Sequence, residues 1–151
     1  MPRMALLGAG GSGIALPLDL GISFVGAWGM YPLSAAATDL FTLRRVSDSA
    51  EQTIARVGSN PDTAAIASFI GASSATIKTL IDQSAGGNNA NQATVNAQPT
   101  YTTHLGKHCS YHRFASANKF YDLPSAPSLT GRNFTIYNIF CIDDRTATAI
   151  T

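Results

Sequence analysis

The sequence predicts a mainly β protein, a sandwich of short strands that carries one short helix. Strand-like stretches are short, and turn-forming residues separate them at intervals of roughly ten residues. One segment alone, residues 60–71, has the spacing of an amphipathic helix. Charged residues make up only 13% of the 151 residues, about half the usual share. Ser, Thr, Asn, Ala and Gly replace them, which suits strands joined by many turns or a surface covered by neighbouring subunits.

Strands are expected wherever bulky apolar and β-branched residues gather between turns. Residues 24–31 have a strand-like composition, with Gly26 and Gly29 allowing bends. In residues 40–46 an arginine falls on each face, so the alternation is imperfect and one arginine is expected at an edge or interface. The predicted strands are 40–46, 51–57, 76–81, 101–103, 108–114, 120–123 and, most strongly, 134–142.

The helix is predicted from its capping residues and its apolar spacing. Asn60 can cap its start, Pro61 suits the first helical position, and Asp62 favours the positive end of the helix dipole. Gly71 ends it. We expect about three turns, buried on one side. The apolar residues that share this side at i, i+3 and i+4 are Ile66, Phe69 and Ile70.

The chain divides into an N-terminal arm, residues 1–22, and a β-sandwich domain, residues 23–151. Residues 8–13 spell G-x-G-x-x-G, but Pro17 interrupts the helix that a dinucleotide site needs. The apolar stretch 14–33 contains Asp19, Pro17, Pro32 and glycines, so no spanning helix is expected. A signal peptide is not expected either, because residues 8–13 interrupt the apolar region that it needs. An apolar arm that packs on a partner is the favoured interpretation.

Charge and cysteine content exclude several classes. The net charge is +1 with no basic run, so no nucleic-acid partner and no membrane insertion are expected. Cys109 and Cys141 permit one disulfide, but two buried free thiols are favoured.

Three histidines, His104, His108 and His112, recur at intervals of four. On a helix they would form a metal-binding face. The surrounding sequence favours a strand, in which residues four apart are separated by about 13 Å. No metal site is therefore predicted, and an interface or a polar sheet face is favoured.

Two stretches carry a family resemblance. Residues 43–54, LRRVSDSAEQTI, followed by the loop Asp82-Gln83-Ser84, resemble the start of the arabinofuranosidase B catalytic sandwich. Residues 121–136 resemble the concanavalin-like, laminin-G-like jelly roll more broadly. The likeness covers roughly residues 24–142, and it implies a jelly-roll sandwich, either incomplete or completed by neighbours. Domains of this kind also occur in bacteriophage structural proteins.

The chain departs from the family pattern in places that bear on activity. Ile81 replaces the family's aromatic residue, residues 84–88 replace its Ser-Gly-Asn-Gly loop, and residues 112–116 lack the aspartate of its Arg-Phe-Asp-Gly strand end. In the enzymes the catalytic carboxylates come well after the segment that Asp82 matches, in a part that this chain lacks. The resemblance therefore implies no turnover.

Asp82 is the best candidate for a site among the nine acidic residues. Its carboxylate can cap the glycine loop through backbone N–H groups, or bind a glycan or Ca²⁺ with amide oxygens of Gln83, Asn88 or Asn89. The capping role is favoured, and no cofactor is expected unless Ca²⁺ binds here. No catalytic pair is assigned. The acids are Asp19, Asp39, Asp48, Glu51, Asp62, Asp82, Asp122, Asp143 and Asp144.

These observations predict a non-enzymatic virion structural protein, such as a capsid decoration protein or a tail fibre component. Its partners would be other virion proteins and copies of itself, with a host glycan as a further partner, and its location the extracellular particle. The alternative is a carbohydrate-binding module; a residual glycosidase is least favoured. Such a module needs an exposed aromatic platform, for which the candidates are Trp28, Tyr31, Tyr101, Tyr111 and Tyr121.

Overall fold

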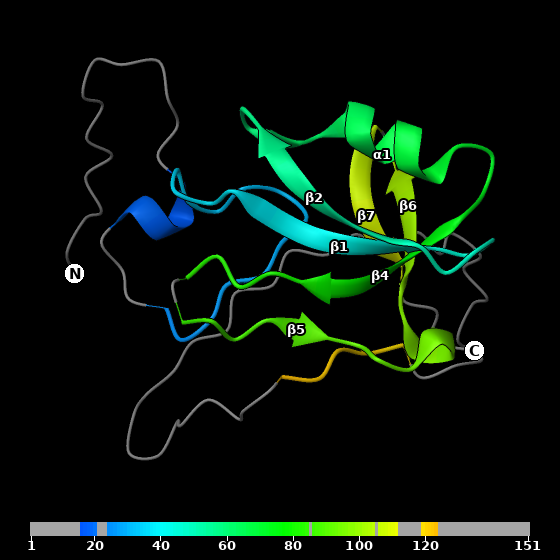
Figure 1. The fold of residues 1–151 in the computed structure, drawn as a ribbon. Helices are drawn as coiled ribbons and strands as arrows, with labels where there is room; N and C mark the ends of the chain where they lie inside the picture. The colour runs from blue at the N-terminus through cyan, green and yellow to red at the C-terminus, as the bar shows by residue number, and fades with distance from the viewer. Residues whose placement is uncertain (1–15, 21–23, 85, 105, 112–118, 124–151) are drawn as a thin grey trace, which may run out of the picture.

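The computed structural model describes residues 16–20, 24–84, 86–104, 106–111 and 119–123. In this part of the chain the mainly β prediction is confirmed, with a single α-helix (Figure 1). The elements are η1 (Pro17–Leu20), β1 (Asp39–Arg45), β2 (Glu51–Val57), β3 (Asn60–Pro61), α1 (Thr63–Ile70), β4 (Ala75–Leu80), β5 (Ala90–Asn91), η2 (Val95–Ala97), β6 (Thr100–His104) and β7 (Lys107–Tyr111).

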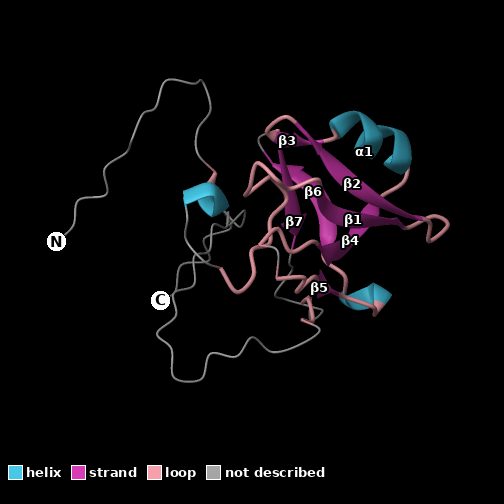
Figure 2. Cartoon of the chain, turned by 60° about the vertical axis from the view of Figure 1, so that its left-hand side comes forward, coloured by secondary structure: helices cyan, strands magenta, loops and turns pink. Residues whose placement is uncertain are grey.

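The strands form one antiparallel sheet in the order β3-β2-β1-β4-β6-β7, with β5 also paired to β4. Strands β5 and β6 share the same edge of β4: β5 pairs at Leu80 and β6 at Thr76. Helix α1 lies against this sheet (Figures 1 and 2). A sheet covered on one face is the arrangement of half a sandwich. The strand predicted at 134–142 lies outside the described residues.

The core lies between the sheet and α1. Ile66 and Phe69 of the helix pack against side chains of the central strands. The register of β1 against β2 shifts between Asp39 and Phe41, which marks a β-bulge. This bulge explains why Leu40 and Phe41 are both fully buried although they are neighbours. The buried cluster comprises Leu40, Phe41, Leu43, Ile54, Ile66, Phe69, Ala75 and Ile77.

The helix begins later than the sequence predicts. Asn60 and Pro61 form β3 and pair with Val57 and Arg56 of β2, so the chain stays extended through Pro61. Asp62 is the N-cap, and its Oδ1 accepts a hydrogen bond from the Ala65 N–H at 2.9 Å. The helix therefore has eight residues, just over two turns instead of three. The prediction that Gly71 ends the helix is confirmed, with φ at 57°.

The predicted strands 40–46, 51–57, 76–81 and 101–103 are confirmed within about one residue. Residues 120–123 contribute only an isolated bridge between Asp122 and Asn91. Residues 24–31 are irregular, because their backbone is held by the loop after β4, mainly through side chains, and not by a neighbouring strand. Predictions for residues 1–15, 112–114 and 134–142 fall outside the described residues. No helix in the described ranges is long and apolar enough to cross a membrane.

Candidate functional site

The loop after β4 is organised by the carboxylate of Asp82. Its Oδ1 accepts hydrogen bonds from the Ala27 N–H at 3.0 Å, the Ser84 N–H at 2.9 Å and the Ser84 hydroxyl at 2.7 Å. Its Oδ2 accepts one from the Asn88 N–H at 2.9 Å. This carboxylate therefore closes its own loop and also fixes Ala27, which lies far earlier in the chain.

Two opposing effects set the pKa of Asp82. Burial raises it, but the hydrogen bonds from Ala27, Ser84 and Asn88 outweigh burial and hold the pKa below its ordinary value. The carboxylate is therefore ionised at neutral pH.

Gln83 and Asn88 hold the segment 25–33 in the same way. Gln83 Oε1 accepts from the Leu33 N–H at 2.7 Å, and its Nε2 donates to the Tyr31 carbonyl at 3.1 Å. Asn88 Nδ2 donates to the Val25 carbonyl at 3.0 Å, and the Asn88 carbonyl accepts from Trp28 Nε1 at 2.7 Å. These contacts give Gln83 and Asn88 the role of clamps on an irregular segment.

Gly86 has a steric reason to be glycine. A Cβ at this position would lie 3.0 Å from the Val25 carbonyl oxygen and 3.1 Å from Asp82 Oδ2. The loop that holds residues 25–33, called the clamp below, therefore needs a residue without a side chain at Gly86, where its backbone lies close to Val25.

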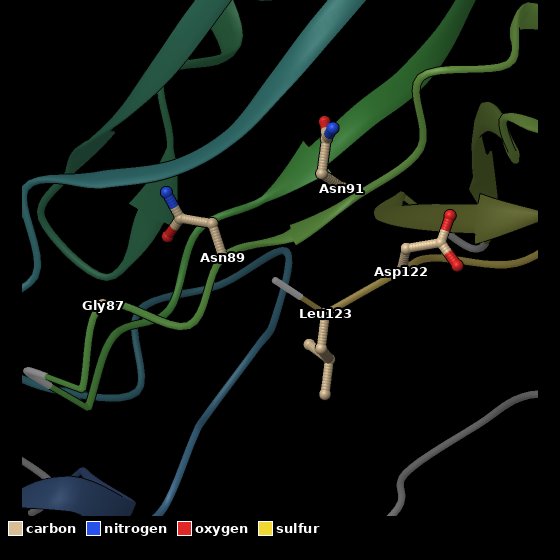
Figure 3. Close-up of a pocket in the computed structure, with 5 residues that line it drawn as sticks. All are labelled: Gly87, Asn89, Asn91, Asp122 and Leu123. Atoms are coloured by element: carbon tan, nitrogen blue, oxygen red, sulfur yellow. The ribbon is translucent and has the colours of Figure 1, made fainter. Parts of the chain in front are cut away.

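Asn89, one of the four predicted ligand-binding residues, lines a hollow in the described part of the surface. This hollow has a volume of about 380 Å³ and is also lined by Gly87, Asn91, Asp122 and Leu123. Asn89 and Asn91 come from the chain entering β5 and from β5 itself, while Asp122 and Leu123 come from the neighbouring segment (Figure 3). Ligand binding at Asp82, Gln83, Asn88 and Asn89 stays a prediction.

The two sides of the hollow are joined by backbone hydrogen bonds. The Asn91 N–H donates to the Asp122 carbonyl at 2.8 Å, and the Asp122 N–H donates to the Asn91 carbonyl at 2.6 Å. The Asn89 side chain is fixed through its Oδ1, which accepts from the Asp82 N–H at 2.9 Å. The exposed Asp122 carboxylate has no hydrogen-bond or ion-pair partner among the described residues.

Sequence reasoning did not place Asn91 and Asp122 in a site. Asp122 stands two residues before Pro124, a position typical of a turn, and β5 is too short to stand out from the surrounding polar residues. The spacing of Asn89 and Asn91 was the available signal, since residues two apart on an extended chain lie on the same side.

Of the three histidines, only His108 has a described side chain. His108 packs against Tyr31 and Tyr101, with ring centroids 6.1 Å and 5.8 Å away, and its backbone N–H donates to the Tyr31 hydroxyl at 2.9 Å. Burial, together with the charge of Lys107, lowers the pKa of His108. His112 lies outside the described residues. Within them, no group of three or more His, Cys, Asp or Glu residues is placed to hold a metal ion.

The aromatic candidates for a platform are engaged in contacts where their side chains are described. Trp28 donates to Asn88, and Tyr31 and Tyr101 contact His108. The Tyr121 hydroxyl lies 3.3 Å from Ser110 Oγ. All four aromatic side chains are half-buried. Cys109 is a half-buried free thiol, and Cys141 lies outside the described residues.

Comparison with known proteins gave no matching family model and no matching curated protein. Solved structures that match include a GH54 α-L-arabinofuranosidase soaked with a cyclic sulfate inhibitor, with 23% identity and a TM-score of 0.46, over 58% of this chain and 22% of that chain. Another is an arabinofuranosidase complexed with arabinofuranosyl-α-1,2-xylobiose, with 22% identity and a TM-score of 0.46. That match covers 56% of this chain and 21% of the other. The match thus spans about a fifth of the length of these structures.

Proposed function

We propose that this chain is a non-catalytic carbohydrate-binding module that takes a sugar in the hollow beside β5. The observation that carries the proposal is that three polar residues, Asn89, Asn91 and Asp122, line a hollow of about 380 Å³. Each amide offers donors and an acceptor, and the carboxylate offers acceptors only. Neighbouring sugar hydroxyls both donate and accept, so they fit this mixture.

The rigidity of the hollow supports binding. Asn91 and Asp122 are held by paired backbone hydrogen bonds, and Asn89 is fixed by the Asp82 N–H. The amide side chains of Asn91 and Asn89 are already placed, by the Thr79 hydroxyl and the Asp82 N–H, so they lose little freedom when a ligand binds. Leu123 adds an apolar surface at the edge of the hollow, against which the C–H face of a sugar can pack.

The hollow is shallow and has one apolar side chain, so single sugars should bind weakly. We expect a dissociation constant on the order of 1 mM for a short oligosaccharide, which is about −4 kcal/mol. Absence of turnover is part of the proposal, and hydrolysis of an aryl arabinofuranoside by the purified chain would contradict it.

The proposal is tested by calorimetric titration with a panel of neutral oligosaccharides. Asp122→Asn and Asn91→Ala should each weaken binding of the sugar that the parent chain takes. The matched controls are Asp39→Asn and Asn96→Ala, because both residues are exposed and neither lines the hollow. Equal loss in variants and controls, or a folded chain that binds no sugar of the panel, would overturn the proposal.

A role in virion assembly stays a second proposal, and one observation favours it. The apolar side chains of Leu20, in the predicted arm, and Val25, just after it, are 54% and 53% exposed. Light scattering of the full chain at several concentrations tests it. An oligomer that Leu20→Ser with Val25→Ser dissociates would support assembly through this region, whereas a monomer at every concentration would contradict it.

A further inference from the structure

A row of polar residues crosses the sheet and ends at the hollow. Thr53 of β2 is paired with Thr42 of β1, Thr42 with Thr79 of β4, Thr79 with Asn91 of β5, and Asn91 with Asp122. Directly opposed residues of neighbouring strands place their side chains on the same face. Strands β2, β1, β4 and β5 and the segment 119–123 follow one another in this order in Figure 1. We call these five residues the polar row.

Side-chain hydrogen bonds within two pairs of the polar row support this shared face. Thr42 Oγ1 lies 3.1 Å from Thr53 Oγ1, and Thr79 Oγ1 donates to Asn91 Oδ1 at 2.8 Å. The sequence neighbours of Thr42, Phe41 and Leu43, are buried in the core cluster with Ile66 and Phe69 of α1. Successive side chains of a strand point to opposite faces. The polar row therefore lies on the face away from α1.

The charges beside the polar row cancel. Lys78 Nζ lies 2.7 Å from Glu51 Oε2, and Arg44 Nη1 lies 3.7 Å from Glu51 Oε1. With Asp122 included, the described residues beside the row carry two cations and two carboxylates. The described part of this face offers no net charge to an anionic or cationic partner, so its charge pattern fits a neutral ligand.

We propose that the polar row and the hollow form one track, which binds an extended, neutral, hydroxyl-rich polysaccharide chain running across the strands. This inference rests on the proposed function. Successive members of the row lie about 4.8 Å apart, the spacing of neighbouring strands. That spacing is comparable with the length of a sugar ring, so successive sugars meet successive hydroxyl or amide groups. One sugar occupies the hollow, and the chain continues toward Thr53, whose exposed side chain forms the far end.

The test compares short and long ligands on the full chain. Disaccharides and hexasaccharides of the cello, xylo, manno and malto series are titrated into the parent chain, Thr53→Val and Asp122→Asn. Valine keeps the shape of threonine and removes its hydroxyl. Thr103→Val is the matched control, since Thr103 is an exposed threonine on β6 outside the polar row. Thermal unfolding shows that each variant is folded.

We expect one hexasaccharide to bind more tightly than its disaccharide. Thr53→Val should weaken the hexasaccharide alone, by about 2- to 10-fold for one neutral hydrogen bond. Asp122→Asn should weaken both ligands, and Thr103→Val neither.

If Thr53→Val binds the hexasaccharide as tightly as the parent chain while Asp122→Asn binds both ligands more weakly, the track is overturned. Binding in the hollow alone would then stand. Absence of binding to every ligand would overturn the proposed function and the track together. Tighter binding of oligogalacturonate than of the neutral series would contradict the neutral class.

Discussion

The carboxylate of Asp82 accepts a hydrogen bond at 3.0 Å from the backbone N–H of Ala27, 55 residues earlier in the chain. Through this contact the loop after β4 holds an irregular segment against the sheet. The same loop continues through Asn89 into β5, so the clamp and the hollow share one piece of backbone. The Asp82 N–H, which donates to Asn89 Oδ1, links them directly.

Removal of the clamp should cost stability. Asp82→Ala leaves three backbone N–H groups and the Ser84 hydroxyl without their acceptor, so we expect the free energy of unfolding to fall by about 2–4 kcal/mol. Urea unfolding measures the change. Asp39→Ala is the control, because Asp39 is exposed, and its effect should stay within about 0.5 kcal/mol. Equal effects of the two substitutions would contradict the clamp.

The turn between β1 and β2 should lose stability in acid. Hydrogen bonds from the Arg45 side chain and the Ala50 N–H lower the pKa of Asp48 from 3.8 to about 2. Because the folded-state pKa is depressed, the contribution of Asp48 is present above the ordinary pKa and is lost as pH falls through the folded one. The stability difference between the parent chain and Asp48→Asn should therefore shrink from pH 4 to pH 2. A difference that stays constant across this range would contradict the ion pair.

The position of the helix N-cap can be tested by substituting Asp62, the observed cap, and Asn60, the cap that the sequence predicts. Asp62→Ala removes the acceptor of the Ala65 N–H and should cost about 1 kcal/mol of the free energy of unfolding. Asn60→Ala should change it by less than about 0.5 kcal/mol, because Asn60 is an exposed residue of β3. Chemical denaturation of both variants gives the comparison. A larger loss in Asn60→Ala would restore the cap predicted from the sequence.

Ser49 should be improved by glycine. Its φ of 61° lies in the left-handed region, which costs a non-glycine residue about 1 kcal/mol or more. We expect Ser49→Gly to raise the free energy of unfolding by about 0.5–1 kcal/mol. Ser47→Gly, in the same exposed turn, should leave stability unchanged or lower it. Thermal unfolding of both variants checks the prediction, which is wrong if Ser49→Gly is the less stable.

Comparison of the predicted and observed elements shows which structural features could be predicted from the sequence. Strands β1 and β2 were predictable because each has enough residues to show its apolar pattern. The helix start was missed because Asn60 and Pro61 take their conformation from pairing with β2. The residues around a helix start do not reveal this pairing with another strand.

The hollow depended on contacts between distant segments. Strand β5 has two residues, and its partner Asp122 lies in another part of the chain. Residues 24–31 have strand composition, but the loop after β4 holds them, through the side chains of Asp82, Gln83 and Asn88 and the Gln83 N–H. Asn89 was predicted as a ligand residue because it belonged to the recognised loop; Asn91 and Asp122 had no such signal.

The most direct test of carbohydrate binding is to map the contact by NMR while a neutral hexasaccharide is titrated into the full chain. The account predicts that the backbone amides of Asn89, Asn91, Asp122 and Leu123 shift with one common dissociation constant. Shifts confined to the cluster of Tyr31, Tyr101 and His108, or no shift with any neutral hexasaccharide, would contradict it.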